Sequence, residues 1–246
     1  MNPSLKLAAI LTCAVACSVA HANPVAEPPF VMTAENVLVG VTPQGIAVAG
    51  TYRYRMSPVY ARYGAPERIP IPGRVRLPIP VPASEKIDAG LMHQVHPELT
   101  FQGEVFDPID EYGHFTSLPD VEGVQFMAVY FDIGPISVPE IEVTIRYTQP
   151  LIERDGKRLA YYLPLLEGFK RFDEKLGLRE SSYAVSFETY GDSTLRLCGQ
   201  PTKVLQETPQ LISVEAHNRE VIAVELIPDA IGEPVEETQT EAARLR

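Results

Sequence analysis

The sequence predicts an all-β protein, mainly antiparallel, built as one or two packed β-sandwiches with one short helix and a long loop. Short apolar runs with a period of two residues indicate strands, and turn residues separate these runs. The 246 residues include 23 prolines, about 9% against a usual share of roughly 5%, which would interrupt long helices. With 45% hydrophobic residues, the chain can build a core and is not wholly disordered.

The first 22 residues have the pattern of a secretory signal peptide. Lys6 precedes an apolar run from Leu7 to Val19, and Ala20-His21-Ala22 matches a small-x-small cleavage site. We therefore expect export to the periplasm or the exterior after cleavage near Ala22. Lipid attachment at Cys17 and an uncleaved anchor are the alternatives, although the apolar run is shorter than the ~20 residues of a membrane-spanning helix. No later segment is apolar enough to span a membrane.

Strands are expected wherever apolar and polar residues alternate. The first two runs flank the turn Pro43-Gln44-Gly45 and predict a long hairpin. Val124 to Ile133 is apolar at nearly every position, which suits a strand buried on both faces or one at the centre of a sandwich. The predicted strands are 35–42, 46–56, 124–133, 141–147, 159–166, 183–190, 194–198, 211–216 and 221–227.

Two turns suggest how the later strands connect. Asp155-Gly156 is the dipeptide that type I′ turns favour, and it predicts a hairpin between the strand at 141–147 and the one at 159–166. Residues 217–220 predict a second hairpin between the last two strands. Only Glu167 to Leu178 has helical spacing of apolar residues.

These elements suggest a division of the chain into four parts. After the signal peptide (1–22), residues 23–166 are expected to form the main β-sandwich domain. Residues 167–228 would add C-terminal β hairpins, a subdomain packed on the first, and the acidic residues 229–246 a flexible tail.

Charge is unevenly distributed along the chain, whose overall net charge is −11. Pro43 to Ala83 holds six arginines and one glutamate, a net charge of +5, whereas Ser84 to Glu142 holds twelve acids and one lysine, a net charge of −11. Either the two segments neutralise each other in exposed ion pairs, or arginines and tyrosines form a surface that binds an anionic partner. The predicted binding residues are Arg53, Arg55, Tyr52, Tyr54, Arg74 and Arg76.

Prolines at alternate positions mark the segment from Ile69 to Pro82. Proline lacks the backbone N–H, so this spacing removes hydrogen-bond donors from one side of a strand only. We therefore expect a capped edge strand, with a docking ligand for an aromatic groove as the alternative.

The long connection from Ser84 to Gly123, with strand potential only around Leu99 to Phe106, contains the candidate metal ligands His93, His96 and His114. Such ligands suit zinc or copper, although Pro97 limits how His96 can be helical. Asp107 to Gly113 is a further candidate, for calcium, but lacks the usual order of ligands. The alternative is that these histidines are solvated loop residues without a ligand. No cofactor is otherwise indicated.

The only cysteine after the signal peptide, Cys198, is expected to be a partly buried structural residue at a strand end, since no histidine lies nearby in sequence to activate it. Common motifs for hydrolases, nucleotide binding and zinc peptidases are absent. The acidic balance argues against nucleic-acid binding. We therefore expect an exported protein with a non-catalytic binding or structural role, whose partner is a protein or an anionic envelope component. The alternative is a metal-assisted hydrolase that uses the histidines of loop 84–123.

Overall fold

A computed structural model of the chain describes residues 30–57, 61, 71–115, 121–164, 182–199, 203–215 and 220–228. The predicted signal peptide with Cys17, the helix expected at 167–178 and the acidic tail lie outside the described residues. The fold is all-β with one short helix among the residues described, as the sequence predicts.

The larger sheet has eight strands and is antiparallel except at its centre, where β1 pairs in parallel with β11. From one edge to the other its strands are β13 (Val204–Glu207), β14 (Leu211–Glu215), β11 (Ser182–Thr189), β1 (Phe30–Thr42), β2 (Gly45–Met56), β8 (Glu140–Gln149), β4 (Glu98–Phe101) and β5 (Glu104–Phe106).

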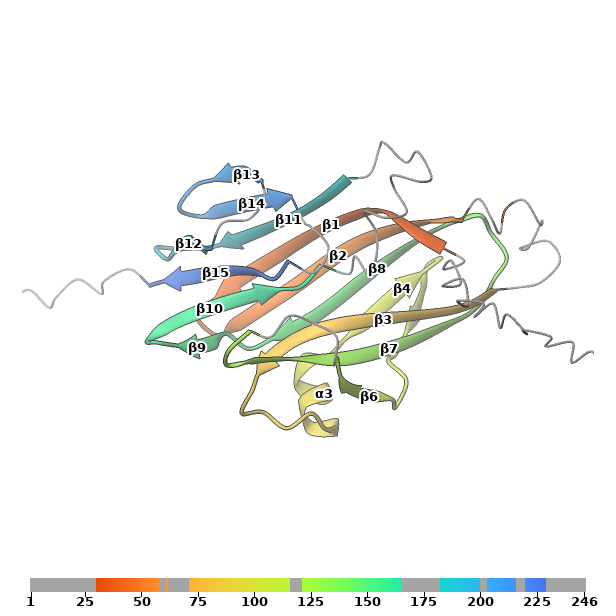
Figure 1. Cartoon of the computed structure of the whole chain (residues 1–246), viewed down its shortest axis with the longest axis horizontal. Helices are drawn as coiled ribbons and strands as arrows, with labels where there is room; N and C mark the ends of the chain where they lie inside the picture. The colour runs from red at the N-terminus through yellow and green to blue at the C-terminus, as the bar shows by residue number, and fades with distance from the viewer. Residues whose placement is uncertain are drawn as a thin grey trace, which may run out of the picture.

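Two smaller antiparallel sheets form the second layer (Figure 1). One has the order β12 (Thr194–Cys198), β15 (Ile222–Ile227), β10 (Lys157–Tyr162) and β9 (Ile152–Arg154). The other has the order β3 (Ile71–Pro82), β7 (Val124–Ile136) and β6 (Tyr112–His114). Inward-facing residues of all three sheets belong to one hydrophobic cluster, so the sandwich has a single continuous core.

The second layer is also apolar on its outer face. In β7, Met127, Val129 and Phe131 face the main core, whereas Val124 and Phe126 belong to a separate outer cluster. The first half of β7 is therefore buried on both faces, one of the two arrangements expected from the sequence, whereas Asp132 in its second half is exposed. In β10, Leu159 and Tyr161 join the same outer cluster while Ala160 and Tyr162 face inward.

The Asp-Gly turn is correctly predicted, but its partner strands are not. Asp155 and Gly156 have φ angles of 51° and 74°, as a type I′ turn requires, and the turn joins β9 to β10. The expected first strand, β8, instead pairs with β2 and β4. The hairpin predicted across 217–220 is wrong, because β14 and β15 belong to different sheets.

Strands from both sides of the expected domain boundary pair with one another. The boundary itself, between residues 166 and 167, lies outside the described residues. Nevertheless, β11 pairs with β1, and β15 pairs with β10. The C-terminal strands are therefore integral members of both sheets that they enter.

The proline-rich segment forms an edge strand, as predicted. β3 pairs only with β7 among the strands described. Ala83 N–H donates to Gly123 O, so the odd-numbered amides point toward β7. Pro78, Pro80 and Pro82 then fall on the open side, where they supply no donors.

The long connection carries more structure than expected. It contains α3 (Ala89–Val95), whose N-terminus is capped by the Asp88 carboxylate, which accepts from the amides of Gly90 and Leu91. The strand potential near Leu99 is confirmed by the β4–β5 hairpin. Within the described part of the chain, no helix has the length and apolar character that a membrane crossing requires.

A group of tyrosines surrounds the fully buried Glu35 between the layers. Tyr162 Oη donates to Glu35 Oε1 at 2.5 Å, and Tyr52 Oη lies 3.2 Å from Tyr162 Oη. The Tyr52 ring lies over Gly50, where a Cβ atom would come within 2.4 Å of the phenolic oxygen. Burial, followed by the nearby Glu35, raises the pKa of Tyr52 and Tyr162 well above the usual tyrosine value.

Candidate functional site

The predicted arginine surface is largely occupied by ion pairs with the acidic segment. On the outer face of the large sheet, Arg53 Nε lies 2.5 Å from Glu142 Oε2, and Arg55 Nε lies 3.0 Å from Glu140 Oε1. Each pair joins directly opposed residues of β2 and β8. This geometry supports the alternative in which the basic and acidic segments neutralise each other.

Arg74 and Arg76 lie on the outer face of the other layer. The Arg74 guanidinium pairs with Glu111 and lies 4.5 Å from the Tyr130 ring centroid, and that of Arg76 lies 3.9 Å from the Phe115 ring centroid. Tyr52 is fully buried and Tyr54 packs against the main core. The structure thus does not bring the six predicted binding residues together on one surface.

The three loop histidines do not converge either. His93 belongs to α3, His96 is its C-cap with a left-handed φ of 44°, and His114 lies in β6. His93 and His96 line a hollow of about 300 Å³ with Asp107 and Asp110, but His114 does not line it. Within the described ranges, no group of three or more His, Cys, Asp or Glu residues could hold a metal ion. The predicted metal site gains no support from this arrangement.

A different hollow, of about 350 Å³, lies on the outer face of the four-stranded sheet. Strand register explains its shape, because Cys198, Ala223 and Tyr161 are directly opposed on β12, β15 and β10. The methyl side chain of Ala223 leaves space between its two larger neighbours. We call this hollow the outer pocket; it is lined by Val121, Arg154, Asp155, Lys157, Leu159, Tyr161, Cys198, Gly199, Val221 and Ala223.

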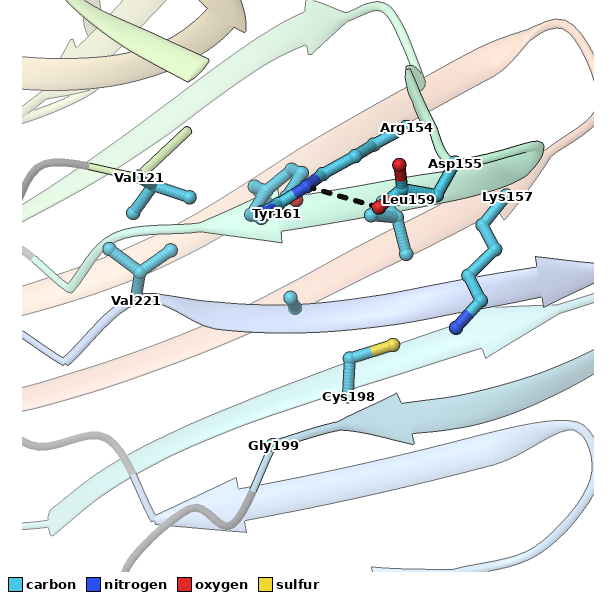
Figure 2. Close-up of a pocket in the computed structure, with 10 residues that line it drawn as sticks. Val121, Arg154, Asp155, Lys157, Leu159, Tyr161, Cys198, Gly199 and Val221 are labelled. Carbon is cyan, nitrogen blue, oxygen red and sulfur yellow. Dashed lines mark ion pairs between the residues drawn. The ribbon is translucent and has the colours of Figure 1, made fainter. Parts of the chain in front are cut away.

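The outer pocket is apolar at one end and charged at the other. Figure 2 shows Val121 and Val221 at one end, and Asp155 and Lys157 at the other. Leu159 and Tyr161, which belong to the outer hydrophobic cluster, lie between them. The outer pocket exposes polar and apolar surface in similar amounts, so it offers both the apolar contacts and the polar groups that small-molecule sites combine.

The two cations of the outer pocket differ in their partners. Arg154 Nη2 lies 2.8 Å from Glu122 Oε2, and its Nε lies 3.6 Å from Asp155 Oδ2, the pair dashed in Figure 2. Burial raises the pKa of Tyr161, and the nearby Arg154 lowers it only in part. Lys157 has no ion pair with any described residue and is exposed. Lys157 is therefore the cation available to an incoming anion.

Cys198 ends β12 and is a partly buried, free thiol, as the sequence predicts. Burial, followed by the charge of Glu225, raises its pKa, and the nearby Lys157 lowers it only in part. No histidine lines the pocket. The thiol is consequently a poor nucleophile near neutral pH, and the lining suits binding better than catalysis.

Sequence reasoning missed the outer pocket because its residues come from four separate segments. The register that places Ala223 between Cys198 and Tyr161 is not visible in the alternation of any one strand. The available signal was the turn at Asp155-Gly156, which is flanked by the cations Arg154 and Lys157.

Comparison with protein-family models finds no match, and comparison with curated proteins finds none either. Among solved structures, the chain is similar to a Legionella pneumophila protein described as a "putative nutrient binding protein", with 12% identity and a TM-score of 0.46 over 81% of this chain and 67% of that one. It is also similar to an M1 zinc metallopeptidase from Deinococcus radiodurans, with 11% identity and a TM-score of 0.35 over 80% of this chain and 42% of the other.

A third similar structure is leukotriene A4 hydrolase from Saccharomyces cerevisiae, with 10% identity and a TM-score of 0.38 over 80% of this chain and 29% of that protein. The chain thus spans less than half the length of either enzyme. At these levels of identity and TM-score, the similarity identifies no family, ligand or activity for the chain.

Proposed function

We propose that the chain is an exported, non-catalytic binding protein whose outer pocket takes a small anionic molecule with an apolar part. The proposal of export is supported by the signal-peptide pattern that the sequence predicts for residues 1–22. The observation that carries the binding role is the exposed Lys157 at one end of a hollow whose other end is apolar. Because the chain as a whole carries a net charge of −11, anions would be repelled from most of its surface, and Lys157 provides a local positive charge at the pocket.

The pocket favours an amphipathic ligand over a purely polar one. The apolar part of the ligand would contact Val121, Val221 and Leu159, where burial contributes about 25 cal/mol per Å² of apolar surface. Its anionic group would lie near Lys157. A carboxylate attached to an aliphatic chain or a ring has the required chemistry, whether it is free or part of a larger envelope component.

Cys198 provides a direct reporter, because it is the only cysteine after residue 17 and it lines the outer pocket. The neutral disulfide dithiodipyridine would be reacted with protein expressed from residue 23. The Cys198 thiolate attacks one sulfur, forms a mixed disulfide and releases thiopyridone, which is followed by its absorbance. The reaction is repeated with increasing octanoate, and separately with neutral octanol.

We expect saturable protection of Cys198 by octanoate at concentrations at which octanol protects less. Lys157→Gln should weaken octanoate binding by a factor of about 1.4 to 5, since an exposed charge pair contributes roughly 0.2–1 kcal/mol. The matched control is Arg53→Gln, which changes net charge equally on the outer face of the opposite layer. The proposal fails if neither compound protects Cys198, or if both variants bind octanoate as the unmodified protein does.

A further inference from the structure

The outer pocket already has a carboxylate at its rim. Glu122 belongs to the turn that follows Val121, a lining residue of the pocket, and its Oε2 lies 2.8 Å from Arg154 Nη2. The Glu122 side chain is 86% exposed, whereas that of Arg154 is 36% exposed. The carboxylate therefore reaches the guanidinium from the solvent side and is not held by burial.

We infer that Glu122 competes with the ligand's anionic group for Arg154, the second cation of the pocket besides Lys157. This inference rests on the proposed function of the outer pocket. Arg154 itself lines the pocket, and its Nε lies 3.6 Å from Asp155 Oδ2. Displacement of Glu122 would present a guanidinium edge that suits a carboxylate and that would act together with the Lys157 ammonium.

The energetics make such an exchange feasible. An exposed ion pair contributes roughly 0–1 kcal/mol, so an incoming carboxylate has little to overcome when it replaces Glu122. Asp155 is a weaker competitor, because its oxygen lies 3.6 Å from Arg154 Nε, beyond the usual hydrogen-bonding distance. Glu122 thus sets the affinity of the pocket for carboxylates and lowers it relative to a pocket without this side chain.

The test compares Glu122→Gln with Glu153→Gln in the Cys198 protection assay with octanoate. Glu153 precedes Arg154 on β9, is exposed and has no ion pair with any described residue, so its substitution gives the same change in net charge without freeing Arg154. We expect Glu122→Gln to bind octanoate about two- to fivefold more tightly than Glu153→Gln. Protection by octanol should be equal in the two variants.

The outcomes separate this inference from the proposed function. If octanoate protects the unmodified protein and Lys157→Gln weakens it, but Glu122→Gln and Glu153→Gln are equal, the competition by Glu122 is refuted and the pocket stands. Weaker binding by Glu122→Gln would also refute it, since the carboxylate would then be assisting the ligand. If octanoate never protects Cys198, the proposed function itself fails.

Discussion

Gly50→Ala is predicted to destabilise the protein by about 2–4 kcal/mol. The added Cβ would lie 2.4 Å from Tyr52 Oη and 2.6 Å from its Cζ, well inside contact distance. The Tyr52 ring has no free space to move into, because it is fully buried and its oxygen lies 3.2 Å from Tyr162 Oη. Overpacking of this kind costs roughly 1–3 kcal/mol, and loss of the tyrosine hydrogen bond adds about 1 kcal/mol.

The matched control is Gly40→Ala in the neighbouring strand β1. There the nearest atom to an added Cβ is Ala47 O at 3.7 Å, an ordinary contact. Because alanine loses less backbone entropy on folding, Gly40→Ala should leave stability unchanged or raise it by about 0.5–1 kcal/mol. Urea unfolding followed by tyrosine fluorescence measures both, since the chain has no tryptophan. Equal stability of the two variants would refute the reasoning about Tyr52.

Three further predictions concern buried polar groups. Tyr162→Phe should lower the free energy of unfolding by about 1–3 kcal/mol, because it removes the hydroxyl that donates to the buried Glu35. Urea titration measures this loss, and a value below about 0.5 kcal/mol would contradict the role of the hydrogen bond. The fold raises the pKa of Tyr52 and of Tyr162, so both contribute fully to stability below pH ~10, where they are neutral in the folded and unfolded chain. Above that pH the unfolded chain ionises first, and the free energy of unfolding should fall by up to about 1.4 kcal/mol per pH unit for each tyrosine. Phenolate absorbance should then rise together with unfolding; full ionisation of all tyrosines in a chain that stays folded by circular dichroism would disprove this. Arg196→Ala should lower the stability of the protein by about 1–3 kcal/mol more than Arg53→Ala, as measured by thermal or urea unfolding. The reason is that Glu225, whose side chain is 10% exposed, loses its partner in a buried position, whereas Glu142, the partner of Arg53, remains exposed to water.

The strands could be predicted where alternation and burial coincide, as in β2, β7 and β8. The short strand β13 was missed because all four of its residues are exposed, which leaves no apolar pattern to detect. The helix α3 buries only Leu91 and Val95, and its main signal is the single capping residue Asp88. Alternation therefore identifies strands that enter the core and passes over elements held mainly by backbone hydrogen bonds.

Strand partners were harder to predict than strands. The pattern at Ile141 to Tyr147 tells which side chains face the core, but it does not distinguish β2 and β4 from the next strand in sequence. The parallel pairing of β1 with β11 likewise has no local signal. The outer pocket depends on such pairings, which is why the charge pattern of the sequence directed attention to arginines that the fold neutralises instead.

The parallel pair at the centre of the large sheet has a consequence for how the chain folds. Val41 O accepts a hydrogen bond from Thr189 Oγ1, across a separation of 148 residues. The middle of this sheet can form only after the chain has been synthesised as far as Thr189, and contacts so distant in sequence form slowly. A delay of this kind leaves the apolar inner faces of both layers exposed for longer, so the refolding protein should be most prone to aggregation before β11 pairs with β1.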